Sequence, residues 1–182
     1  MPLLKTITTP YAEAFLQLSE AAGDTDEVVA QARQLLVLWK ESPELREAMA
    51  SPVLEVETKK AAISKLFSDQ VSPTFLNLLK LLTDRQRIGY LDAVIERFLD
   101  LYRDQNQIAL ASVTSAEALS DEQVANITEQ VKAVAGTDKV EINTAVDPAL
   151  IGGFVLKVGS KVIDASLSGQ VRRLGLALAK VS

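Results

Sequence analysis

The chain has 182 residues, of which 48% are hydrophobic and 24% charged, with a formal net charge of -5 and a pI near 4.9. This apolar content is enough for one large core or two small ones, whereas the acidic charge argues against unaided nucleic-acid binding, which needs clustered Lys and Arg. Cys and His are both absent, which excludes disulfides, thiolate nucleophiles and the usual zinc sites and counts against an enzyme.

The chain contains no apolar run of the roughly 18 residues needed to cross a bilayer, and its first residues lack the pattern of a secretory signal. We therefore expect a soluble, folded protein that reaches any membrane only through a partner.

The first 105 residues carry a helical pattern. Apolar residues recur at helical spacing in six segments, and the connections are short, so the pattern predicts one compact bundle of six helices. Gly23 suits the C-terminal cap of the first helix. Four pairs of a hydroxyl residue and a proline predict helix starts, because the hydroxyl can accept from free amides and proline needs no acceptor: Thr9-Pro10, Ser42-Pro43, Ser51-Pro52 and Ser72-Pro73.

Composition changes near residue 105. Eight of the nine aromatic residues precede this point, and six of the eight glycines lie at or after Gly136. We expect two domains, residues 1–105 and 106–182, joined at the polar segment 104–107.

The second half begins with a strand near residues 108–113. Ser120 and Gln123 form a capping-box pattern that predicts a helix ending at Gly136. Alternating apolar residues predict strands at 140–146, 154–158 and 162–163, with a hairpin at Gly159-Ser160 and a terminal helix from about Gln170. The order β, α, β, β, β, α predicts a small α+β domain with a mixed sheet, and the fold class of the whole chain is α+β.

Three polar motifs have ordinary structural explanations. Gly152-Gly153 with Gly159-Ser160-Lys161 lacks the spacing of a phosphate loop, and we expect a bend or close backbone approach there. Asp24, Asp26 and Glu27 lie where a helix begins, which favours capping over a metal site. Residues 84–87 are expected to form a solvated turn, with a structural ion pair of Arg87 as the second choice.

Apolar residues on the first and fifth helices exceed what a small bundle needs for its interior. Some should therefore line a groove that receives an amphipathic helix. The candidates are Tyr11, Phe15, Leu18, Phe75, Leu78, Leu79 and Leu82. The terminal helix is also apolar and is expected to contact a partner through Val171, Leu174 and Leu178.

The segment from Val140 to Arg173 resembles the C-terminal motif of the F-type ATP synthase delta subunit family, called OSCP in mitochondria, and the similarity is closest to its cyanobacterial and chloroplast branch. Upstream segments agree in order, so the resemblance covers nearly the whole chain. These segments are Tyr11-Ala12-Glu13-Ala14, Ser51-Pro52-Val53 before Lys59-Lys60, Phe75-Leu76-Asn77-Leu78-Leu79 before Arg87, and Val113-Thr114-Ser115-Ala116 before Leu119-Ser120.

The resemblance implies a non-catalytic stator subunit of a proton-driven ATP synthase, without cofactor, metal or small-molecule substrate. The helical domain would bind N-terminal helices of the α subunits on the α3β3 head, through the fifth helix and through a face of the first helix that includes Tyr11 and Ala14. The second domain would bind b-type subunits of the peripheral stalk. The protein would be peripheral to the energy-converting membrane, on its cytoplasmic or stromal face, and the cyanobacterial and chloroplast branch implies the thylakoid.

Two alternatives of other classes stay open at this point. Six-helix bundles also occur in RNA-associated regulators, although the acidic charge and the β-rich second half disfavour this. An enzyme that uses only carboxylates and lysine would need a pocket where two such groups have perturbed ionisation.

Overall fold

The computed structural model describes residues 2–171. The chain divides into two compact units, Met1–Tyr102 and Arg103–Ser182. The division falls within α6 (Leu91–Asn106), just before the polar segment 104–107, where the helix ends ahead of the first strand. The helix continues to Asn106 and ends where Gln107 takes a left-handed backbone with φ of 55°.

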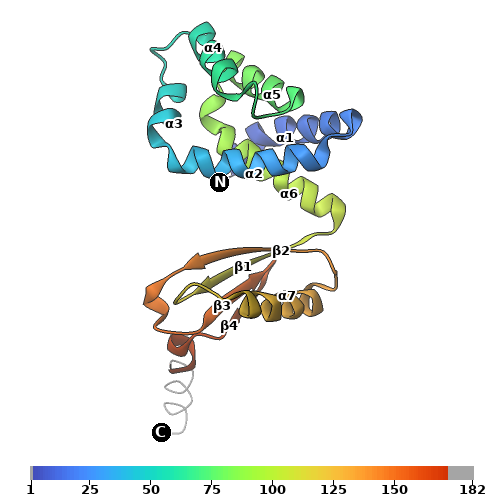
Figure 1. The fold of residues 1–182 in the computed structure, drawn as a ribbon, viewed down its shortest axis with the longest axis vertical. Coiled ribbons are helices and arrows are strands. Elements are labelled where there is room, and N and C mark those ends of the chain that lie inside the picture. Colours follow the sequence, from blue (N-terminus) through green and yellow to red (C-terminus); the bar gives the residue numbers. More distant parts are fainter. Residues whose placement is uncertain (1, 172–182) are drawn as a thin grey trace. The chain divides into compact units, whose positions relative to one another are not determined.

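The first unit is helical, as predicted (Figure 1). Before α6 it contains five α-helices and the 3-10 turn η1, which leads into α6. Their bounds are α1 (Pro2–Ala22), α2 (Thr25–Glu41), α3 (Pro43–Ala50), α4 (Val56–Phe67), α5 (Pro73–Asp84) and η1 (Ile88–Tyr90). Gly23 ends α1 with φ of 73°, which confirms its capping role.

Only two of the four hydroxyl-proline pairs begin a helix. Pro43 and Pro73 are the first residues of α3 and α5, and Ser72 Oγ accepts from the amide of Phe75 at 3.3 Å. The prediction is wrong for Thr9-Pro10, because α1 begins earlier and Pro10 lies inside it with its ring exposed. It is also wrong for Ser51-Pro52, since Pro52 lies in the turn before α4 begins at Val56.

An aromatic cluster occupies the core of the first unit. The Phe15 ring lies 5.1 Å from that of Phe75 and 4.7 Å from that of Phe98, measured between centroids. Trp39 and Ile63 are fully buried in the same core. Tilted aromatic pairs of this kind add about 0.5–1.5 kcal/mol to the free energy gained by burial, so α1, α5 and α6 are held by their largest side chains.

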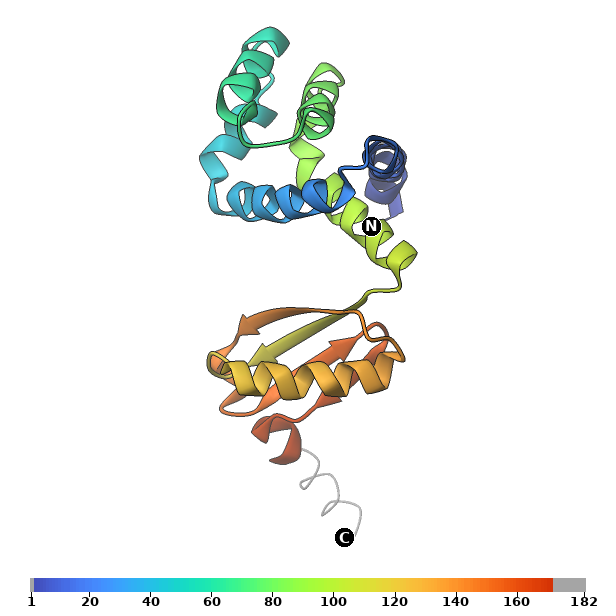
Figure 2. The ribbon, with the colours of Figure 1, turned by 45° about the vertical axis from the view of Figure 1, so that its right-hand side comes forward.

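The second unit is an α+β domain with the predicted element order. Its four-stranded mixed sheet has the order β2-β1-β3-β4, with β1 parallel to β2 and antiparallel to β3. Helix α7 lies over one face of this sheet (Figure 2). The bounds are β1 (Ala109–Ser115), α7 (Asp121–Ala135), β2 (Val140–Val146), β3 (Phe154–Val158) and β4 (Lys161–Asp164), with a 3-10 turn η2 at Pro148–Leu150.

Both ends of α7 follow the predicted chemistry. Ser120 Oγ accepts from the amide of Gln123, and the Gln123 side chain accepts from the amide of Ser120, which is the reciprocal capping box. Gly136 closes the helix with φ of 71°. The buried core between α7 and the sheet is small. Among the described residues it consists of Ala111, Val113, Ile127, Val131 and Leu156.

Candidate partner-binding surfaces

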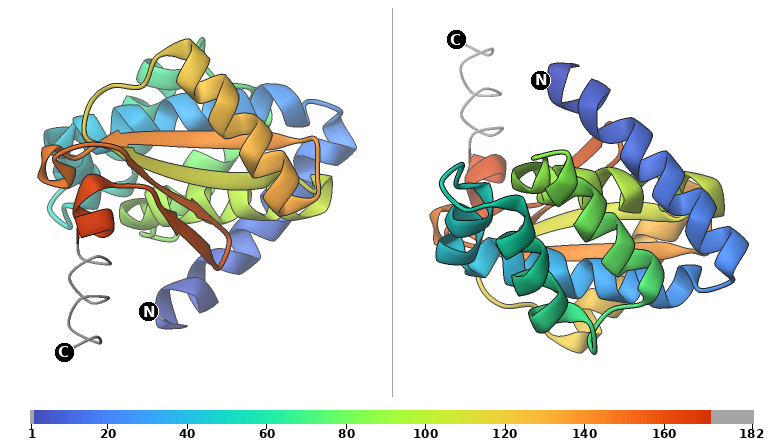
Figure 3. Two further views of the ribbon diagram at one scale, coloured as in Figure 1. Left: turned by 90° about the horizontal axis from the view of Figure 1, so that it is seen from below. Right: turned by 90° about the horizontal axis from the view of Figure 1, so that it is seen from above.

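Helices α1 and α5 are antiparallel neighbours, and Figures 1 and 3 show them side by side. Polar contacts tie both ends of the pair. Thr74 Oγ1, at the start of α5, donates to Asp24 Oδ2 at 3.0 Å, just after the end of α1. Arg87, just after α5, donates from Nη1 to the hydroxyl of Tyr11 at 2.8 Å. The pair is thus a rigid platform whose outer face could receive another helix.

Most of the groove residues expected from the sequence belong to the core. Phe15, Phe75, Leu78, Leu79 and Leu82 are all buried by the chain's own side chains. The excess of apolar residues on α1 and α5 is therefore used internally, in a core cluster that these residues share with side chains of α2 and α6. These five side chains do not line an open groove in this structure.

The accessible candidates form a stripe along α1. Leu18 is 60% exposed, Ala14 is exposed and Tyr11 is half-buried. Half-buried Ile7 and exposed Ala21 extend the stripe at alternating spacings of four and three residues, which place all five side chains on one helical face. The sequence analysis missed these two extensions, although this spacing was the signal that could have found them.

Arg87 interacts with Tyr11 in two ways. Besides the hydrogen bond, its guanidinium lies 5.6 Å from the centre of the tyrosine ring, within the range of a cation–π contact. The ion pair expected as the second choice for Arg87 is not what the structure shows, since the nearby carboxylate of Asp84 pairs with Lys60 at 3.0 Å. Arg87 thus fixes the Tyr11 side chain at the edge of the α1 stripe.

The acidic residues at 24–27 serve the fold. Asp26 and Glu27 lie in the first turn of α2, where negative charge is favourable, and Asp26 Oδ1 accepts from the Tyr102 hydroxyl at 3.1 Å. Asp24 occupies the N-cap position but makes no side-chain capping bond, and its Oδ2 accepts from Thr74 instead. Within residues 2–171, no three acidic side chains gather in an arrangement that could hold a metal ion.

The paired glycines of the C-terminal motif permit a close backbone approach, as predicted. Gly153 has φ of 78°, and a Cβ there would lie 2.4 Å from the carbonyl oxygen of Ala165. The carbonyl of Gly152 accepts from the amide of Leu167 at 3.0 Å. The pair brings β3 against the chain that follows β4, which is an architectural role rather than phosphate binding.

A hydroxyl and a carboxylate organise the same junction. Asp164 Oδ1 accepts from both the amide and the hydroxyl of Ser166, at 3.0 and 2.5 Å. Ser166 Oγ in turn accepts from the amide of Gly169 at 3.0 Å, as an N-cap would. Residues 167–171 are already helical, so the terminal helix begins three residues before the predicted start at Gln170.

Apolar side chains are exposed where this terminal helix begins. Val171 is 68% exposed and Leu167 is 50% exposed. On the neighbouring β4, Val162 and Ile163 are also exposed. Leu174 and Leu178, the other residues expected to contact a stalk, lie outside the described part of the chain. No helix among residues 2–171 is both long and apolar enough to cross a membrane.

Comparison with known proteins agrees with this architecture. The family model described as "ATP synthase delta (OSCP) subunit" matches residues 7–178. The chain is 69% identical over 182 residues to an ATP synthase subunit delta of Prochlorococcus marinus, covering 100% of both chains. It is 59% identical over 181 residues to the corresponding organellar chromatophore subunit of Paulinella chromatophora, again covering 100% of both chains.

A solved structure shows the same fold at much lower identity. A chain in the mitochondrial ATP synthase hexamer of Toxoplasma gondii superposes with a TM-score of 0.74 and 20% identity, covering 93% of this chain and 96% of that one. The helical unit, the four-stranded sheet and the glycine-pair junction thus occur together with a full-length sequence match, and the chain belongs to the ATP synthase delta (OSCP) subunit family.

Proposed function

We propose that this chain is the stator subunit that fastens the catalytic head of a proton-translocating F-type ATP synthase to its peripheral stalk. The observation that carries this is the full-length match to ATP synthase delta subunits at 69% identity. The subunit is non-catalytic, as its family is. By holding the head still, it lets the torque of the rotor act on the nucleotide sites of other subunits. The RNA-associated alternative has no support from the relatives, and the net charge of -5 also disfavours it.

The first part of the proposal is that residues 1–105 form a domain that binds an N-terminal helix of an α subunit. Support comes from the α1 stripe of Ile7, Tyr11, Ala14, Leu18 and Ala21, which offers an apolar face of about four helical turns. Because the larger candidates are buried, we assign the contact to this stripe rather than to the fifth helix. An amphipathic helix packing along it would cover apolar surface that the chain itself leaves open.

A matched pair of substitutions tests the stripe. Leu18→Asp should weaken binding of a peptide from the α-subunit N-terminus to the full chain at least about tenfold, since it places a charge at the centre of the contact. Val37→Asp is the control, because Val37 is similarly exposed but lies on α2. Phe75→Asp is unsuitable, as Phe75 is fully buried and the charge would unfold the bundle. Equal affinities of both variants and the unaltered chain would move the site away from α1.

The second part is that residues 106–182 form a domain that binds the b-type stalk. Support comes from the exposed Leu167 and Val171 at the start of the terminal helix, next to the rigid junction of Asp164, Ser166 and Gly169. We extend the contact to Leu174 and Leu178 by their spacing from Val171. The protein would thereby be peripheral to the energy-converting membrane, attached to it only through the complex, on the cytoplasmic or stromal face and, in a photosynthetic cell, at the thylakoid.

Reconstituted vesicles test the stator role. Deleting residues from Val171 onward keeps the capping junction and should leave the head bound, while its attachment to the membrane sector is lost. ATP hydrolysis by the released head should continue, whereas proton-driven synthesis should stop because nothing opposes the torque. Normal synthesis by the truncated form would remove the role assigned to this segment, and loss of hydrolysis would mean that the chain acts on catalysis directly.

A further inference from the structure

Among residues 2–171, one buried lysine of the helical unit has no carboxylate partner. Lys59, on α4, is only 8% exposed. Its Nζ donates to the carbonyl of Ser51 at 2.6 Å, which is the one acceptor that the described part of the chain gives it. An ammonium group has three donors and is costly to remove from water unless its charge is balanced. Lys59 therefore has charge and donors left to offer a ligand.

The adjacent lysine shows what a balanced cation looks like in this fold. Lys60 pairs with Asp84 at 3.0 Å and with Glu57 at 3.5 Å, and the hydrogen bond to Asp84 raises its pKa above the usual 10.5. Lys60 is also more exposed than Lys59. Lys60, the more exposed of the two lysines, thus has two carboxylate partners. Lys59 is better buried and has no carboxylate partner among the described residues.

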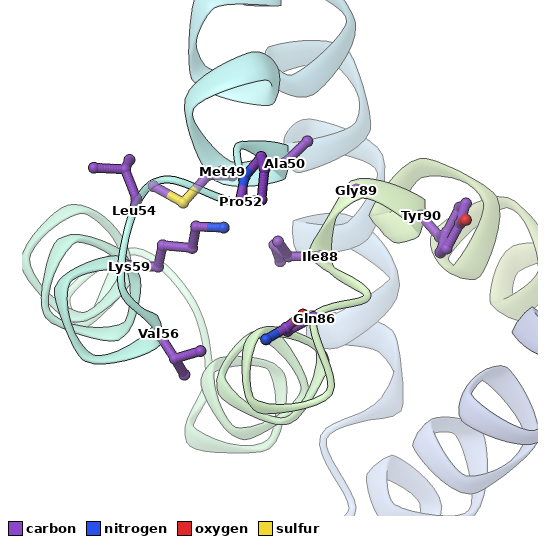
Figure 4. Close-up of a pocket in the computed structure, with 10 residues that line it drawn as sticks. All are labelled: Met49, Ala50, Pro52, Leu54, Val56, Lys59, Gln86, Ile88, Gly89 and Tyr90. Carbon is purple, nitrogen blue, oxygen red and sulfur yellow. The ribbon is translucent and has the colours of Figure 1, made fainter.

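Lys59 lines a pocket of about 340 Å³ between the turn after α3, the start of α4 and η1. Figure 4 shows its ammonium pointing into the space between these segments. The remaining wall is mostly apolar, and Gln86 contributes an amide. The apolar lining includes Met49, Pro52, Leu54, Val56 and Ile88. A ligand that fills such a pocket must combine one anionic group with an aliphatic body.

The apolar surface continues outside the pocket. Leu54 and Tyr90 at its rim are exposed, and Val53 beside it is 86% exposed. A free carboxylate of a few carbon atoms would leave this rim uncovered, whereas a peptide with apolar residues on both sides of an acidic one would cover it. Charge and surface together favour a peptide as the occupant.

We propose that this pocket is a docking site for an acidic side chain of a partner protein, a Glu or Asp between apolar residues, whose carboxylate pairs with Lys59. No residue of the α1 stripe lines this pocket. The carboxylate supplies the missing counter-ion, and the flanking residues cover Val53, Leu54 and Tyr90.

The test uses the full chain and two blocked pentapeptides, ALELA and its neutral counterpart ALQLA, at constant ionic strength. The amide signals of Ile88 and Gly89 should shift saturably with ALELA in two-dimensional NMR, and ALQLA should bind at least tenfold more weakly. Lys59→Met should lose the same factor, whereas the matched control Lys60→Met should stay within twofold. Equal binding of the two peptides, or full affinity of Lys59→Met, would overturn the proposal.

A further variant and a further ligand complete the test. Leu54→Asp changes only the exposed rim and should reduce ALELA affinity at least threefold by repulsion, so it replaces Lys59→Met if that variant does not fold. Butyrate, a small carboxylate, should bind more weakly than ALELA because it leaves the rim uncovered. Butyrate binding as tight as that of ALELA would identify a small-anion pocket and overturn peptide docking.

Discussion

The two units of this chain differ in what they do with their apolar side chains. The helical unit encloses four phenylalanines and Trp39 in one continuous core. Among the described residues, the core of the α+β unit consists of only five small or medium residues. Both units leave some large apolar side chains exposed, such as Val53 in the first and Ile151 in the second. Because buried apolar area is the main source of stability, the first unit should be stable by itself, and the second should gain more from a partner.

The largest change in stability is expected when an aromatic ring is removed from the core of the helical unit. Phe98→Ala should cost about 3–5 kcal/mol of unfolding free energy, because the ring is fully buried and contacts Phe15. Urea unfolding followed by the fluorescence of Trp39, the single tryptophan, reports on the helical unit alone. The amide signals of β1 should keep their own midpoint. A common midpoint that falls with Phe98→Ala would show one cooperative unit instead of two.

The glycine-pair junction should produce the next largest effect, and only in the α+β unit. Gly153→Ala forces a left-handed backbone on alanine and a clash with the carbonyl of Ala165, so it should cost at least about 1–3 kcal/mol. Gly159→Ala is the control, since its φ is also positive but nothing lies near its Cβ position. If both substitutions cost the same in urea unfolding, the close approach contributes nothing beyond backbone strain.

A smaller loss is expected at the start of α7. Ser120→Ala removes the acceptor of the capping box and should cost about 1 kcal/mol. Ser120→Asp should restore most of it, because aspartate caps equally well. Hydrogen exchange of the first amides of α7 would register the change directly. Unaltered exchange in Ser120→Ala would show that α7 is held by packing on the sheet alone.

The smallest effect concerns the alkaline limit of the helical unit. The hydrogen bond to Asp84 raises the pKa of Lys60 above 10.5. A cation whose pKa is raised by folding contributes stability that is complete below 10.5 and is lost as the pH rises through the folded-state pKa. The urea midpoint by Trp39 fluorescence should fall slightly above pH 10.5, and less so in Lys60→Met. A steeper fall in that variant would contradict the assignment.

Sequence patterns predicted most helices and strands, because in both units these elements follow from local signals such as apolar periodicity and helix caps. Helical periodicity indicated the six helices, and the Ser120–Gln123 box and Gly136 located α7 within a residue. Two hydroxyl-proline pairs misled, since proline also occurs inside a helix, where it removes one backbone hydrogen bond, as at Pro10, and in turns, as at Pro52.

The candidate surfaces were less predictable because exposure is a property of the whole fold. Periodicity identifies an apolar face but does not say whether another helix covers it. Phe75 and Leu82 were thus assigned to a groove that their own unit fills. The Lys59-Lys60 pair was visible only as part of the family resemblance, and the pocket was not predicted. A lysine beside another lysine is typical of a solvated helix surface, and only the fold shows that Lys59 is buried.

The strand order has a consequence for synthesis on the ribosome. The central strand β1 pairs with β2 about thirty residues later, beginning with Ala109 against Val140, and with β3 beyond it. The helical unit is complete once residue 102 has emerged, and its contacts can form at once. The sheet must wait for nearly the entire chain, because its middle strand has no partner until then, and distant pairings form slowly. A nascent chain paused between residues 116 and 140 would therefore carry a folded bundle and the unpaired strand β1. This partly folded intermediate is the one that most needs a chaperone.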